Sequence, residues 1–262
     1  RERGFPPVLA WGSLAILASV DLSTVYPSYP DYFDQDAFRL VVTRDGATAY
    51  LVGASTEVVA VDLARRQVAA RIPFAANPLH GPRGLALSPD ERTLFVSDSP
   101  SRRVAVIDTA TRTLSTFLAM DGLPTQVRIT RDGTRMLVLQ RATTNMITIV
   151  DTGTLAVVKK AHLSVGHALD LELSPDERRV FVVDFDPNYL IAYDLDVDRP
   201  AWIGSAVLDP FNAVRSPDGQ RIYVTGFSSD TIAVFDATTG EELEPIRLAA
   251  APRVARRRLP RG

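Results

Sequence analysis

The sequence predicts an all-β protein built from one four-stranded unit that recurs along the chain, and three observations support this. Short apolar segments, the turn residues that bound them and two recurring aspartates all follow the same period. The first aspartate lies in a turn written R-D-G or S-P-D, at intervals of 45, 42, 44 and 42, and is found at Asp45, Asp90, Asp132, Asp176 and Asp218. The second ends an apolar segment, at intervals of 46, 43, 43 and 42, and is found at Asp62, Asp108, Asp151, Asp194 and Asp236.

Each unit is expected to form four short strands. In the second unit, residues 84–88 form the first segment, a turn follows, and residues 94–97, 104–107 and 114–118 supply the other three. These segments are rich in Val, Ile, Leu and Phe and are bounded by Gly, Pro, Asp and Ser, as strands are. They lack clean apolar-polar alternation, which indicates strands covered on both faces. A ring of packed four-stranded sheets, the β-propeller, meets this requirement.

Several motifs resemble those of a known family. Residues 222–226, with the sequence IYVTG, are similar to the motif of the YVTN-type β-propeller repeat, and YLVGA, LFVSD and VFVVD occupy the same place in other units. The turns SPDE and SPDG also match, whereas MLVLQ at residues 136–140 departs from the motif. The resemblance spans about residues 40–248 and implies a propeller of an exported protein, periplasmic or extracellular. Because the family includes surface-layer proteins, lactonase-like enzymes and domains beside redox cofactors, it implies no single activity.

The length of 262 residues fits one domain, most simply a propeller of six blades. A propeller that closes its ring leaves no unpaired sheet edge. We therefore expect the closing blade to be shared between the two ends of the chain, although a fragment of a seven-bladed propeller is the alternative. A signal peptide is the competing interpretation of the N-terminal segment. The expected boundaries are a blade-closing segment at 1–36, full repeats at about 37–81, 82–123, 124–167, 168–209 and 210–251, and a closing strand with a basic tail at 252–262.

Composition limits the classes of partner. The net charge of -2 and the pI of about 6.0 argue against a globally basic nucleic-acid binder. The apolar segment at residues 8–20 is shorter than the roughly 20 residues that a bilayer span needs, so no membrane span is expected. Arginines crowd the last ten residues, which form either a solvated tail or a site for an anionic partner. The oligomeric state does not follow from these features.

Comparison between units places the candidate site away from the recurring aspartates. Those aspartates and their neighbouring glycines are typical of tight turns, and they define one face of the ring. The connections that vary in length lie on the other face, where repeat proteins usually bind partners. The longest, residues 73–83, carries two candidates, and equivalent positions of the first strands surround the channel mouth. The predicted binding residues are Arg39, His80, Arg83, Gln126, Asp170 and Asn212.

The function expected from this pattern is non-catalytic binding or scaffolding, with a protein or small-molecule partner on the loop face. No nucleophile elbow, zinc-protease pair, phosphate loop or haem motif is present, so no catalytic residue and no cofactor is assigned. An anionic ligand between Arg39 and Arg83 would favour a small-molecule site. The alternative is a lactonase-like or metal-dependent hydrolase, similar to six-bladed calcium enzymes. In it Asp170, Glu172 and Asn212, with Gln126, would hold calcium, and His80 or His167 would carry a proton.

Overall fold

The computed structural model describes residues 39–53, 56–74, 84–163, 166–226 and 228–248. Within these residues the protein is all-β, with twenty strands in five four-stranded antiparallel sheets and no helix. Accordingly, none of the described residues belongs to a helix of the length and hydropathy needed to cross a membrane. The predicted closing segments, 1–36 and 252–262, lie outside the described residues, as do His80 and Arg83.

The five sheets follow one another along the chain as blades. Blade 1 comprises β1 (Arg39–Val42), β2 (Thr48–Val52), β3 (Glu57–Asp62) and β4 (Gln67–Pro73). Blade 2 comprises β5 (Leu85–Leu87), β6 (Thr93–Asp98), β7 (Arg103–Asp108) and β8 (Thr113–Ala119). Blade 3 comprises β9 (Leu123–Ile129), β10 (Arg135–Arg141), β11 (Met146–Asp151) and β12 (Val157–His162).

The last two described blades continue the same order. Blade 4 comprises β13 (Ala168–Leu173), β14 (Arg179–Asp184), β15 (Tyr189–Asp194) and β16 (Arg199–Ser205). Blade 5 comprises β17 (Pro210–Arg215), β18 (Arg221–Gly226), β19 (Thr231–Asp236) and β20 (Glu242–Arg247). In every blade the hydrogen-bonded order follows the chain order, which places the first and fourth strands at opposite edges.

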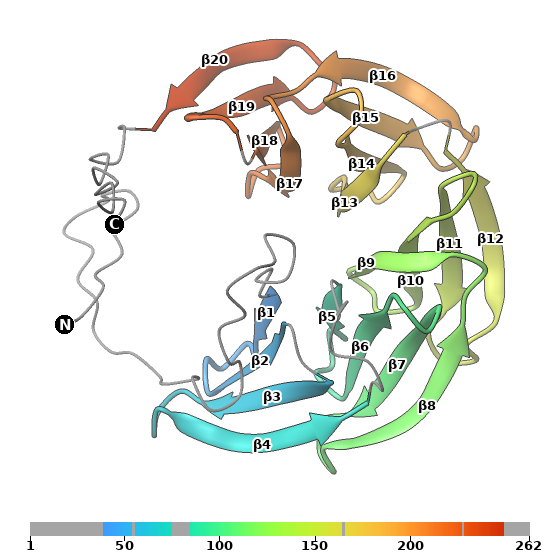
Figure 1. Cartoon of the computed structure of the whole chain (residues 1–262), viewed down its shortest axis with the longest axis vertical. Coiled ribbons are helices and arrows are strands. Elements are labelled where there is room, and N and C mark those ends of the chain that lie inside the picture. The colour runs from blue at the N-terminus through green and yellow to red at the C-terminus, as the bar shows by residue number, and fades with distance from the viewer. Residues whose placement is uncertain (1–38, 54–55, 75–83, 164–165, 227, 249–262) are drawn as a thin grey trace, which may run out of the picture.

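The blades are arranged around a common centre. Figure 1 shows β1, β5, β9, β13 and β17 nearest the centre and the fourth strands at the periphery. Antiparallel blades of this kind around a channel define a β-propeller. The sequence prediction of an all-β propeller is therefore confirmed, with five blades in the described part of the chain.

The recurring aspartates are turn residues, as the comparison between units predicted. Asp132 accepts hydrogen bonds from the Thr130 hydroxyl at 2.6 Å and from the Thr134 amide at 3.0 Å. These bonds lower the pKa of Asp132 to about 2. Gly133 follows with a φ of 75°, a conformation that glycine adopts at no steric cost. At the end of the third strand, Asp151 accepts from the Thr154 amide at 2.8 Å.

Apolar side chains seal each contact between neighbouring blades. The first-strand residue five positions before the turn aspartate is buried in blades 2 to 5. These residues are Leu85, Val127, Leu171 and Ala213, which are 6%, 0%, 0% and 5% exposed. The equivalent residue of blade 1, Leu40, is 60% exposed. The two end blades of the described arc thus differ from those inside it: Val214, on the far side of blade 5, is also 58% exposed, whereas its blade 2 equivalent, Ala86, is 8% exposed.

Candidate functional site

Two of the predicted binding residues, Gln126 and Asp170, are buried in a polar contact between blades. Asp170 in β13 is 1% exposed, and its Oδ1 accepts from Gln126 Nε2 at 2.6 Å. Its Oδ2 accepts from the backbone amide of Ala213 in β17 at 3.1 Å. Because Gln126 lies in β9, one carboxylate joins blades 3, 4 and 5 beside the channel. The Asp170 carboxylate thus has hydrogen-bond partners on both oxygens despite its burial, and it links the first strands of three blades.

Glu172 extends this contact with two further cations. Arg128 Nε lies 3.4 Å from Glu172 Oε2, and Arg215 Nε lies 3.7 Å from Glu172 Oε1. Arg128 also donates to Asp170 Oδ1 at 3.2 Å. Burial raises the pKa of Glu172, and the charge of Arg128 opposes that shift. The two carboxylates that the calcium hypothesis requires are therefore bound by guanidinium groups.

The remaining members of the calcium hypothesis are placed differently. Asn212 Oδ1 is buried and has no hydrogen-bond donor among the described residues. No group of three or more His, Cys, Asp or Glu side chains in the described ranges is placed to hold a metal ion. A calcium ion next to Asp170 and Glu172 would have to compete with Arg128 and Arg215 for the same oxygens.

His167, the described candidate for a proton carrier, has a partner at each ring nitrogen. Its Nδ1 lies 3.2 Å from Asp186 Oδ2, and its Nε2 lies 2.7 Å from Arg141 Nη2. Arginine can only donate, so Nε2 accepts and Nδ1 carries the proton toward Asp186. The ring is thus held in place by Arg141 at the end of β10 and by Asp186 in a turn, and neither nitrogen faces an open site.

The first strands of blades 1 to 3 line a pocket along the channel. Its volume is about 570 Å³, within the range of ligand pockets. Two predicted residues, Arg39 and Gln126, belong to it. Four arginines and no Asp or Glu are among the described lining residues, which are Arg39, Leu40, Val41, Arg44, Leu85, Ala86, Leu87, Pro89, Gln126, Arg128, Ile129, Thr130 and Arg131. We call this the channel pocket.

The four arginines of the channel pocket are held in different ways. The guanidinium of Arg39 lies 5.8 Å from the centre of the Phe211 ring, a cation–π contact. Arg44 Nη2 donates to the carbonyl of Pro89 at 2.9 Å, and Arg128 is bound to Asp170 and Glu172. Arg131 is exposed, and the structure gives its guanidinium no hydrogen bond or ion pair within the described residues. Arg128 is thus already paired with two carboxylates outside the lining, whereas the guanidinium of Arg131 has no partner within the described residues.

Sequence comparison missed Arg44, Arg128 and Arg131, although a signal for two of them was present. Units 1 and 3 write the turn as T-R-D-G, whereas units 2, 4 and 5 write it as S-P-D. Arg44 and Arg131 therefore stand where Pro89, Pro175 and Pro217 stand in the other blades. Their backbone amides donate to Glu91 and Glu177 of the next blade, each at 2.5 Å, which fixes the turns beside the pocket.

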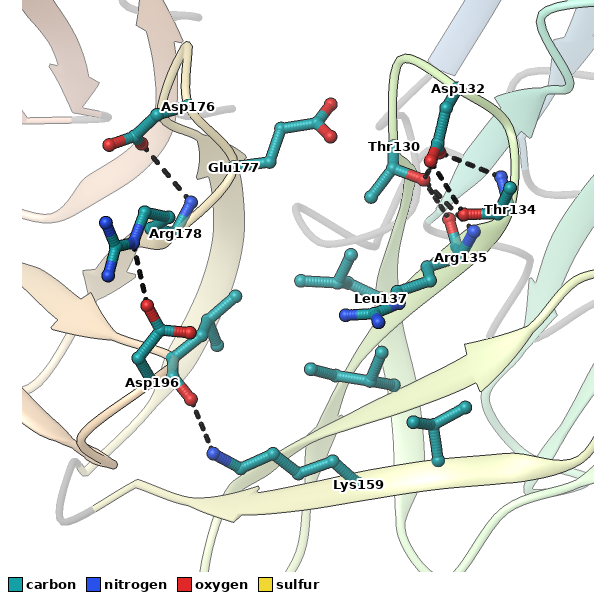
Figure 2. Close-up of a pocket in the computed structure, with 13 residues that line it drawn as sticks. Thr130, Asp132, Thr134, Arg135, Leu137, Lys159, Asp176, Glu177, Arg178 and Asp196 are labelled. Carbon is teal, nitrogen blue, oxygen red and sulfur yellow. Dashed lines mark hydrogen bonds and ion pairs between the residues drawn. The ribbon is translucent and has the colours of Figure 1, made fainter.

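A second pocket of about 470 Å³ lies between blades 3 and 4, near their aspartate turns. Figure 2 shows Glu177 on the blade 4 side and Arg135 on the blade 3 side of this space, with Leu137 beneath Arg135. Lys159 closes the outer end by donating to the carbonyl of Leu195 at 2.5 Å. We call this the interblade pocket. It shares only Thr130 with the lining of the channel pocket.

Comparison with known proteins supports the fold and no more. No family model matches the chain, and no curated protein sequence matches it significantly. Many solved structures share the fold. One is hydrazine synthase of Kuenenia stuttgartiensis, which is 19% identical, covers 86% of this chain and 69% of its own, and has a TM-score of 0.68. At this level of identity the likeness shows a β-propeller fold without assigning a site or an activity.

Proposed function

We propose that this protein is a non-catalytic binding propeller of the YVTN kind that holds an anionic small molecule in the channel pocket. One observation carries the proposal: a pocket of about 570 Å³ whose described lining contains four arginines and no carboxylate. Guanidinium groups recognise carboxylates and phosphates through paired hydrogen bonds. Apolar walls supplied by Leu85, Ala86 and Ile129 lower the local dielectric and strengthen such pairs.

The placement of the arginines favours a ligand with more than one anionic group. Arg39 begins β1, and Arg44 lies in the turn that follows it, so about 16 Å of extended chain separate their backbones. Arg128 near the end of β9 and Arg131 in the turn after it are closer, with about 10 Å of extended chain between their backbones. A dicarboxylate, a tricarboxylate or a phosphorylated compound could contact arginines at both ends of this wall, whereas a simple anion would contact one.

Titration calorimetry at constant ionic strength tests the proposal, with acetate, glutarate and citrate as probes. We expect citrate to bind the wild-type protein in a saturable way and acetate to bind at least about tenfold more weakly, a difference near 1.4 kcal/mol. Arg131→Gln should weaken citrate binding by a similar factor, because its exposed guanidinium has no other described partner to satisfy.

The matched control is Arg92→Gln. Arg92 is an exposed arginine near the aspartate turn of blade 2 and lies outside the channel pocket. Arg92→Gln removes the same charge as Arg131→Gln does, but outside the channel pocket, so it should leave citrate binding unchanged. Equal losses in Arg92→Gln and Arg131→Gln would mean that only net charge matters, and they would contradict a defined site.

Two further parts of the proposal concern the whole protein. We infer that a sixth blade, shared between residues 1–36 and 252–262, covers the exposed Leu40 and Val214. An exported location, periplasmic or extracellular, rests on the family resemblance alone. Protease protection of the N-terminal segment that is lost in Leu40→Asp would support the shared blade, whereas identical digestion of both proteins would argue against it.

A further inference from the structure

The interblade pocket exists at a position where blade 3 departs from the other described blades. Five residues after each turn aspartate, the second strands carry Tyr50, Phe95, Leu137, Phe181 and Tyr223. Blade 3 is thus the one described blade without an aromatic ring at this position. The first four face the next blade, since Tyr50, Phe95, Leu137 and Phe181 all pack in cores that join two blades. The substitution to leucine removes a ring from the contact between blades 3 and 4.

The neighbouring contact between blades 4 and 5 shows how aromatic rings can fill such a space. In blade 4, Phe181 pairs across the sheet with Ala192, which pairs with Trp202. The Trp202 ring lies 5.8 Å from Phe181 and 6.3 Å from Phe235 of blade 5, so three rings fill the contact between blades 4 and 5. In blade 3 the same row reads Leu137, Ile149 and Lys159. Lysine therefore stands where blade 4 has tryptophan, and about 470 Å³ remains open.

The open space has an apolar floor and a charged rim. Leu137, Ile149 and Leu195 form its buried base and are 1%, 5% and 9% exposed, whereas Val158, which borders the space, is 54% exposed. Much of the rim charge is already bound: Asp132 and Asp176 accept bonds within their own turns, and Arg178 Nε donates to Asp196 Oδ2 at 2.7 Å.

Two charged groups on opposite walls remain for a ligand. The Arg135 guanidinium of blade 3 forms no hydrogen bond or ion pair within the described residues, and its charge acts at longer range on Asp132 and Asp151. Glu177 of blade 4 uses one carboxylate oxygen, Oε1, to accept from the Arg131 amide. Figure 2 shows both side chains directed toward the space between the blades.

We propose that the interblade pocket binds a small zwitterionic aromatic compound, of which a free aromatic amino acid is the simplest example. Its ring would lie against the exposed Val158, above the buried Leu137 and Ile149 and next to the position where the other described blades carry a ring of their own. Its carboxylate would bind Arg135, and its ammonium group would bind the open oxygen of Glu177. This site is separate from the channel pocket, and neither proposal depends on the other.

Titration calorimetry with L-phenylalanine as the probe tests the site. We expect saturable binding, and binding weakened at least about tenfold for phenylpropionate, which lacks the ammonium group, and for phenethylamine, which lacks the carboxylate, because each loses one charge-assisted hydrogen bond. Cyclohexylalanine should also bind more weakly, since it keeps both charges but is not flat. Equal affinity for all four probes, or no saturable binding of L-phenylalanine, would overturn the proposal.

Leu137→Phe is the most informative variant, because it restores the ring that the repeat carries elsewhere. It should abolish binding of L-phenylalanine while leaving citrate binding in the channel pocket intact. Leu123→Phe makes the same chemical change outside the pocket and should bind as the wild type does. If Leu137→Phe fails to fold, Arg135→Gln serves instead and should weaken binding about tenfold or more. Unchanged binding in a folded Leu137→Phe or Arg135→Gln protein would contradict the site.

Discussion

The two halves of the central channel use equivalent strands in opposite ways. Along blades 3 to 5, Asp170 is 1% exposed and receives bonds from Gln126, Arg128 and the Ala213 amide, so the strands are sealed together. Along blades 1 to 3 the wall opens into the channel pocket, where charge of one sign accumulates. The difference shows that a polar residue at a repeat position is structural when the next blade supplies its partner. In the open half, the equivalent residue of blade 1 is Arg39, whose guanidinium lies over the Phe211 ring of blade 5.

Glycine contributes to the same contrast. Gly84 stands in blade 2 where the other first strands carry Arg39, Gln126, Asp170 and Asn212. A Cβ at this position would lie 2.8 Å from the backbone of Gln126 and Val127. The backbone of β9 therefore approaches blade 2 more closely than a side chain at this position would allow.

Asp170→Ala should have the largest effect, because it breaks the sealed half. It leaves Arg128, Gln126 and the Ala213 amide without a buried acceptor, and breaking such a buried pair costs about 3–5 kcal/mol of unfolding free energy. Urea unfolding measures the loss. Asp170→Asn keeps one carbonyl acceptor and should lose less. A loss below about 1 kcal/mol for Asp170→Ala would mean that the contact does not hold the blades together.

Gly84→Ala should have an intermediate effect, at the boundary between the two halves. The added methyl group meets backbone atoms at 2.8 Å, so β9 must shift, and overpacking of this kind costs about 1–3 kcal/mol. Thermal unfolding is the measurement. Gly46→Ala is a poor control because Gly46 has a φ of 71°, whereas Gly153→Ala meets only Asp151 Oδ1 at 3.6 Å and should cost less. Equal losses at Gly84 and Gly153 would remove close backbone approach as the cause.

Acid should lower the stability of the propeller against unfolding in both halves alike. The pKa of the turn aspartates, among them Asp45, Asp90 and Asp218, is lowered by hydrogen bonds to neighbouring side-chain hydroxyls and backbone amides. The pKa of these aspartates is lower in the folded protein than the unfolded value of 3.8. Their contribution to stability is therefore fully present above about pH 4 and is lost as pH falls toward 2. Glu172 acts in the opposite sense, because burial raises its pKa and favours the protonated form in the fold.

Chemical denaturation at pH 7, 4 and 2.5 measures this dependence. We expect the denaturant concentration at the unfolding midpoint to be lower at pH 2.5 than at pH 4, both in the wild-type protein and in Glu172→Gln. The fall should be slightly steeper in Glu172→Gln, since the opposing contribution is removed. A midpoint that rises on acidification would contradict the assignment of the aspartates to stabilising turns.

Arg131→Gln should have the smallest effect on stability. Its exposed side chain has no described hydrogen-bond partner, and substitutions of that kind change the unfolding free energy by no more than about 0.5 kcal/mol. Arg128→Gln provides the comparison across the two halves, because Arg128 binds Asp170 and Glu172 and should cost more. Urea unfolding of both variants would test the contrast, and similar losses would show that the two arginines are equally structural.

The sequence predicted the features that depend on local repetition. The strands, the aspartate turns and the propeller fold all follow from residues within one unit, such as Asp132 with Thr130 and Gly133. The partners of Asp170 could not be predicted, because Gln126 lies 44 residues away in another blade, and a single repeat does not show which side chains meet across a contact. The aromatic position occupied by Leu137 was recognisable as a departure, but its cavity depends on the adjoining Lys159 and Leu195.

The central claim is that the open half of the channel holds an anionic ligand, and a crystal structure of the citrate complex tests it most directly. The account predicts ordered citrate between β1, β5 and β9, with its carboxylates within hydrogen-bond distance of Arg39 or Arg131 and with Asp170 still bound to Gln126. Citrate bound at another surface, or a channel pocket that stays empty at saturating citrate, would contradict it.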